Sequence, residues 1–208
     1  DYFAAASLSD GALTATGVVT DTTLIFGSGA EVLFSVPDGT SRTYTLKLWI
    51  NRNLPSGADG KLIAFTIDPN NHAPTDAIGS AFAPANAVAS SPIRLDVIAT
   101  KLVVRGVDPA LVVVPAGVKV GIRVQALDVS GNLDLDYEGQ QPLVFSGANV
   151  ALSGHRPTAT DFGGGSKPFG EETPVTFTDG ISASTTLALY RAESASIKAT
   201  HGLITTDQ

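Results

Sequence analysis

The chain has 208 residues, of which 43% are hydrophobic and only 16% charged, against about 25% charged residues in typical soluble domains. This composition can build a core and is not that of a disordered chain. The net charge of −7 without a basic cluster argues against nucleic-acid binding and anionic membrane surfaces, and the absence of cysteine excludes disulfides and thiolate metal sites.

The first half alternates apolar and polar residues in short runs that are separated by turn residues. Helical periodicity is nowhere stronger than this alternation, and the best helix candidate, residues 4–13, is short and has an alanine run that does not decide between helix and strand. Residues 68–89 are rich in Pro, Asn, Ala and Gly and predict a long irregular connection. Strands are predicted around Val18 to Phe26 with a turn at 20–22, and at 32–36, 44–50, 63–67 and 93–99, with a further turn at 37–39.

The second half continues the pattern, and its clearest run is residues 118–126. Val118, Val120, Ile122, Val124 and Ala126 fall on one face, and polar residues occupy most of the other, which is typical of a half-buried strand. Further strands are predicted at 102–104, 143–145, 175–177, 181–189 and 197–199, with a hairpin turn at 179–180.

Many short strands at this spacing predict an all-β chain with two tandem antiparallel β-sandwich domains. The predicted domains are residues 1–99 and 100–208, joined near Ala99-Thr100. The joint contains no Pro, Gly or Ser, so we expect a short and semi-rigid connection.

The second half carries motifs that resemble immunoglobulin-like modules of large bacterial cell-surface proteins. They are the segments ALD at 126–128, GN at 131–132, YEG at 137–139, VTFTDGI at 175–181 and LALYRAESASIKA at 187–199. The resemblance covers about residues 100–204. It implies an Ig-like sandwich and further modules of the same polypeptide, or other copies of it, as partners.

The first half resembles a different module of giant surface proteins exported by the type IX route. The matching segments are IF at 25–26, VPDGT at 36–40, YTLKLWI at 44–50, FTI at 65–67 and VIATKL at 97–102. In such modules this pattern follows one or two earlier strands, so the resemblance implies that the first domain lacks its opening strand or strands. Since the chain does not start with methionine, we expect it to be part of a longer protein.

The turn that follows the strand at 118–126 is the main chemical question. Asp128, Asn132, Asp134 and Asp136 offer oxygen ligands of the kind that calcium binds, although their spacing is not that of an EF-hand. Gly131-Asn132 alone is also sufficient for a type I′ turn with solvated aspartates. We favour the turn and keep calcium, the one cofactor considered, as the alternative.

A second oxygen-rich cluster, Asp68, Asn70, Asn71 and Asp76, is interpreted as a turn first and a calcium site second. Tyr137 is predicted to pack near a strand end with its hydroxyl bonded to backbone. Trp49 is expected to pack on a neighbouring module or loop, with a platform for a sugar ring as its alternative.

No catalytic constellation is predicted. The histidines lack metal-ligand spacing, no G-x-S-x-G elbow occurs, and GGG at 163–165 is not a phosphate-binding loop. We therefore expect a non-catalytic structural or adhesive module pair of an extracellular surface or filament protein that is not inserted in a membrane. Its external ligand would be a surface glycan or a protein. The alternative is a carbohydrate-binding accessory of a secreted hydrolase.

Overall fold

A computed structural model describes residues 1–27, 36–37, 39–67, 87–108 and 113–206. The described residues are all-β and contain no helix, which confirms the all-β part of the predicted fold class. In particular, they contain no helix of a length and apolarity that would cross a membrane. The predicted strand at 32–36, apart from Val36, and the oxygen-rich cluster at 68–76 lie outside the described residues.

The chain forms two compact units. One comprises Asp1–Ala58 and Leu62–Arg94, and the other comprises Asp59–Lys61 and Leu95–Gln208. The chain therefore passes between the units near Arg94, and a three-residue segment from the first half belongs to the second unit. The predicted domain joint near residue 99 stays a prediction.

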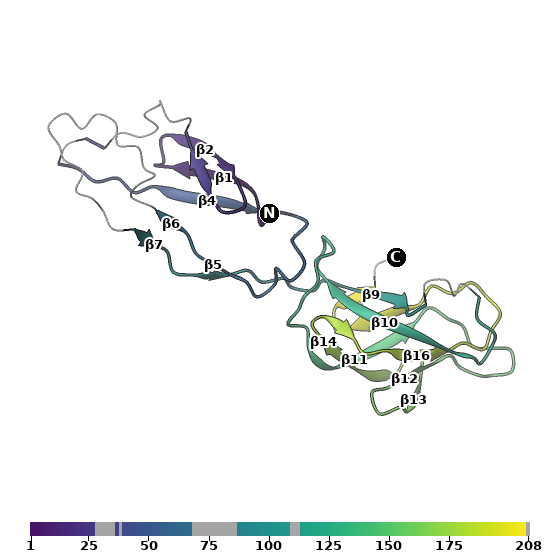
Figure 1. The fold of residues 1–208 in the computed structure, drawn as a ribbon. Helices are drawn as coiled ribbons and strands as arrows, with labels where there is room; N and C mark the ends of the chain where they lie inside the picture. The colour runs from purple at the N-terminus through teal and green to yellow at the C-terminus, as the bar shows by residue number, and fades with distance from the viewer. Residues whose placement is uncertain (28–35, 38, 68–86, 109–112, 207–208) are drawn as a thin grey trace. The chain divides into compact units, whose positions relative to one another are not determined.

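The first unit is built from small antiparallel sheets (Figure 1). A four-stranded sheet has the order β3-β2-β1-β4, and β5–β8 and β6–β7 form two separate pairs. The strands are β1 (Phe3–Ser9), β2 (Thr14–Val19), β3 (Leu24–Phe26), β4 (Thr45–Ile50), β5 (Leu62–Ile63), β6 (Thr66–Ile67), β7 (Val88–Ala89) and β8 (Ile93–Arg94).

The helix candidate at 4–13 is wrong, because those residues contain β1. Ala6 pairs with Gly17 on one side and with Leu48 on the other. Two neighbouring strands thus satisfy the backbone of the alanine run, and this pairing overrides the weak local preference of alanine for a helix. The predicted turn at 20–22 is confirmed by the hydrogen bond that Thr20 N–H donates to Thr23 C=O at 2.9 Å.

The second unit contains a closed barrel (Figure 1). Its strands are β9 (Lys101–Gly106), β10 (Lys119–Leu127), β11 (Gly139–Ser146), β12 (Thr158–Thr160), β13 (Ser166–Pro168), β14 (Glu172–Thr178), β15 (Ile181–Ser182), β16 (Thr185–Ala188), β17 (Lys198–His201) and β18 (Ile204–Thr206).

Seven strands close this barrel in the order β10-β15-β14-β11-β17-β18-β9, because β9 pairs with β10 as well as with β18. β10 pairs with β15 along one part of an edge and with β16 along the other part of the same edge. The sheet continues from β16 to β12 and then to β13. All pairs are antiparallel except β18–β9, which is parallel. The expectation of purely antiparallel sheets is therefore wrong at this pair, where the β17–β18 hairpin turns the chain to run alongside β9.

The alternation at 118–126 correctly predicted the inward face of β10 but placed its start too early, because Val118 precedes the strand and is 48% exposed. Ile122, Val124 and Ala126 are buried in a core that all sides of the barrel contribute to. Leu102, Leu143 and Phe145 are completely inaccessible to solvent. The barrel interior is therefore packed with apolar side chains.

The predicted continuous strand at 181–189 is instead two strands, β15 and β16, with a break at 183–184. Ala183 N–H donates to Thr176 C=O of β14, whereas β16 pairs with β10 and β12. Both strands pair with β10, but their second partners differ: β15 pairs with β14 and β16 pairs with β12. The turn at 179–180 is confirmed, with both Asp179 (φ 48°) and Gly180 (φ 74°) in the left-handed region.

Candidate metal centre

The residues after β10 form two successive turns with different roles. In the first, Asp128 accepts hydrogen bonds from Ser130 N–H and Asn132 N–H on Oδ1, both at 2.8 Å, and from Asn132 Nδ2 on Oδ2 at 2.7 Å. The left-handed residue here is Gly131 (φ 94°), and Asn132 is not left-handed. Asp128 and Asn132 thus hold each other in an Asx-type turn, which is not the predicted type I′ hairpin.

The second turn places Asp134 and Asp136. Leu133 makes a bridge with Leu127, Asp134 N–H donates to Ala126 C=O, and the chain then turns through residues 135 and 136. The chain is therefore no longer extended after Leu133. Asp134 is buried and Asp136 is exposed.

Two further aspartates of the second unit join this turn, and the sequence analysis missed both. Asp59 lies in the segment Asp59–Lys61, which is fixed by hydrogen bonds between residues 60–61 and Leu95: Gly60 N–H donates to Leu95 C=O and Leu95 N–H donates to Lys61 C=O, each at 2.8 Å. Asp96 follows Leu95 directly and is exposed.

The carboxylates of Asp59 and Asp134 accept backbone hydrogen bonds that a neighbouring strand would otherwise accept. The segment 95–99 was predicted as a strand from its alternation, and Leu95, Val97 and Ala99 are indeed buried, but it is not part of a ladder. Instead, Val97 N–H donates to Asp59 Oδ1 at 2.8 Å and Ala99 N–H donates to Asp134 Oδ2 at 2.7 Å. The other oxygen of Asp59 accepts from Leu135 N–H at 2.7 Å.

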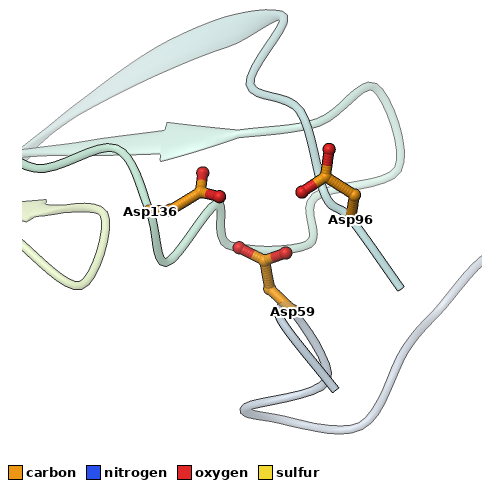
Figure 2. A group of neighbouring side chains, drawn as sticks. All are labelled: Asp59, Asp96 and Asp136. Atoms are coloured by element: carbon orange, nitrogen blue, oxygen red, sulfur yellow. The ribbon is translucent and has the colours of Figure 1, made fainter. Parts of the chain in front are cut away.

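Carboxylate oxygens of Asp59, Asp96 and Asp136 converge on one point (Figure 2). One oxygen from each lies within 4.8 Å of the others. Asp59 is buried, whereas Asp96 and Asp136 are exposed. We call these three residues together with Asp134 the four-aspartate cluster.

Asp134 is the most deeply buried member of the cluster, at 5% exposure. Burial raises the pKa of its carboxyl to about 6. The hydrogen bond from Ala99 N–H opposes this shift, and the adjacent Asp136 carboxyl and the charge of Asp59 add to it. The pKa therefore records a carboxylate that is removed from water and faces other negative groups.

Of the predicted calcium ligands, the structure brings Asp134 and Asp136 together and leaves Asp128 and Asn132 in their own turn. The two members that were not predicted, Asp59 and Asp96, are distant in sequence from Asp134 and Asp136. Only the residues around each of them could have indicated a role in the site. Asp59 lies within an Ala-Asp-Gly turn, and Asp96 is one of two charged residues, with Arg94, in the alternating run at 93–99.

Trp49 lies on β4 of the first unit and is 51% exposed. Tyr137 packs edge-on against Phe177, with ring centroids 4.8 Å apart. Its hydroxyl is bonded to Nδ1 of His201 at 2.6 Å, so the prediction of a packing tyrosine is confirmed and the prediction of a backbone partner is wrong.

Comparisons of the chain with protein-family models, with curated proteins and with solved structures found no match.

Proposed function

We propose that the chain is a non-catalytic structural part of a large extracellular surface or filament protein. The observation that supports this most is the closed barrel, whose interior is packed with apolar side chains such as Leu102, Val124 and Phe145. A barrel that is filled in this way has no lumen for a substrate, and closure removes the open sheet edges at which chains aggregate or are attacked.

We further propose that each unit is a variant of an Ig-like β-sandwich, with neighbouring modules of the same polypeptide or other copies of it as partners. In the second unit, β9 pairs with both β10 and β18. A strand that pairs with both layers at once converts an open sandwich into a closed barrel. The Ig-like motifs at 126–139 and 175–199 support the proposal on the side of the sequence.

Surface location provides the test. Antibodies raised against the purified chain should label intact cells that make the parent protein, and external protease should remove that label. A parent protein found only inside the cell would contradict the proposal. An intracellular marker protein, which must survive the same protease treatment, controls for lysis.

Carbohydrate binding is a second candidate, favoured by the exposure of Trp49. A flat aromatic ring on a strand can stack on a sugar. On a glycan array, Trp49→Ala should abolish binding under this hypothesis. Ile50→Ala is the matched control, because Ile50 is the next residue on β4 and is exposed to a similar extent, at 54%. Equal binding by both variants would exclude the Trp49 platform.

A further inference from the structure

The four-aspartate cluster combines two independent observations. The first is the convergence of Asp59, Asp96 and Asp136, with one carboxylate oxygen of each within 4.8 Å of the others. The second is Asp134, which is 95% buried, taken from its 5% exposure. Its Oδ2 accepts from Ala99 N–H, whereas its Oδ1 is inaccessible and accepts no hydrogen bond from the described residues.

The Asp134 carboxyl lies beside two other members of the cluster. It lies within hydrogen-bonding reach of the Asp136 carboxyl and close enough to Asp59 to be affected by its charge. A buried anionic oxygen that has no donor is unfavourable, and further carboxylates at this distance add repulsion. A bound cation would remove both penalties at once.

We propose that Asp59, Asp96 and Asp136 bind one Ca²⁺ ion, with the buried carboxyl of Asp134 beside Asp136 adding negative charge to the site. All four are aspartates of the second unit, from the segments 59–61, 95–99 and 134–136. This site is independent of whether the parent protein is located at the cell surface, so each proposal can fail alone.

The donor set selects calcium over other common metals. All donors are carboxylate oxygens, whereas zinc sites are built mainly on histidine and cysteine. Magnesium keeps most of its waters and uses one or two carboxylates, whereas calcium takes six to eight oxygens at about 2.4 Å. Two ligands of such an ion lie at most about 4.8 Å apart, so the three oxygens, which lie within 4.8 Å of one another, are close enough to share one ion.

The ion would connect three segments of the second unit. The Asp59 and Asp134 carboxylates already bind the backbone of 97, 99 and 135. With calcium bound, the three segments would also be held to one another through the metal by Asp59, Asp96 and Asp136. Water can complete the coordination on the side where Asp96 and Asp136 are exposed.

The test is calcium titration of the full chain, followed by isothermal calorimetry and by the melting temperature. The protein is first freed of metal with EGTA. At a calcium concentration 100-fold above Kd, we expect Tm to rise by at least about 5 °C, and equal magnesium to raise it by less. Unchanged Tm up to 10 mM calcium, which is about tenfold above the Kd of the weakest useful sites, would overturn the proposal.

Substitutions of the proposed ligands test where the calcium ion binds. Asp96→Asn and Asp136→Asn change exposed residues, so both should fold, and each should weaken calcium binding at least about tenfold. Glu172→Gln is the charge-matched control, because Glu172 is exposed on β14 of the same unit, and it should bind calcium like the parent chain. Wild-type affinity in both aspartate variants would show that any calcium binds elsewhere and would overturn the site.

Discussion

Asp134 carries opposing demands, because its negative charge favours a bound cation nearby and is unfavourable without one. Its Oδ2 accepts a hydrogen bond from Ala99 N–H, and its carboxyl lies beside that of Asp136. An asparagine has nearly the same shape. Its amide oxygen can keep the bond to Ala99, and its amide nitrogen can donate to a neighbouring carboxylate.

Asp134→Asn should therefore change stability in opposite directions with and without calcium. In EGTA we expect the free energy of unfolding to rise by about 1 kcal/mol, because a buried charge beside other charges is removed and the partly exposed neighbours screen the rest. In millimolar calcium the variant should be less stable than the parent chain. Urea unfolding in both buffers measures this, and a loss of stability in EGTA would contradict it.

Gly180 supports the four-aspartate cluster from a neighbouring turn. It belongs to the β14–β15 turn, has φ 74°, and is so close to the backbone of Asp134 that an added Cβ would collide with the Asp134 carbonyl oxygen. Its own C=O accepts from Ala126 N–H. The β14–β15 turn thus packs against the backbone of Asp134 and fixes the position of the turn that carries this residue.

Gly180→Ala should lower the free energy of unfolding by about 2 kcal/mol or more and weaken calcium binding, because both the backbone conformation and the collision oppose alanine. Gly131→Ala is the control. Gly131 also has positive φ, at 94°, but an added Cβ there would meet no atom within 4 Å. It should lose only about 1 kcal/mol. Equal losses in the two variants, by urea unfolding, would exclude a specific role of the collision.

The segment Asp59–Lys61 offers a local readout of the metal. Lys61 is exposed and lies two residues from Asp59. Trypsin should cut after Lys61 faster in EGTA than in calcium, because cleavage requires local opening of a segment that the ion holds. Cleavage after exposed Arg191, outside any strand, should be unaffected. Mass spectrometry of the fragments distinguishes the two sites, and equal protection at both would contradict local binding.

Local pattern was sufficient for some elements and not for others. The inward face of β10 follows from side-chain alternation, which depends only on adjacent residues. The four-aspartate cluster does not follow from such alternation, because Leu135 N–H donates to the carboxylate of Asp59, which lies 76 residues earlier in the chain. The alternation at 95–99 correctly predicted buried residues, yet side-chain carboxylates replaced the expected neighbouring strand.

The short strand β18 closes the barrel of the second unit. It pairs with β17 and with β9, and the Thr206 hydroxyl also accepts from Ala199 N–H at 2.8 Å. Neither its three-residue length nor its parallel pairing was apparent in the sequence, because closure is decided by contacts between the two ends of the unit.

Truncation after Gly202 should therefore open the barrel. We expect a fall in Tm of at least about 5 °C and binding of a hydrophobic dye, since core residues such as Leu102 lose cover. Truncation after Thr206 removes only Asp207 and Gln208 and is the control. A Tm equal to that of the control would show that β18 contributes little.

The parallel pairing of β9 with β18 also has a mechanical consequence. Thr205 and Thr206 pair with Lys101 and Leu102, so the strands near the two ends of the second unit lie side by side and point the same way. A pulling force along the polypeptide would draw these strands in opposite directions along their own axes. Their hydrogen bonds would then be loaded in shear, all together, and not opened one after another like a zipper.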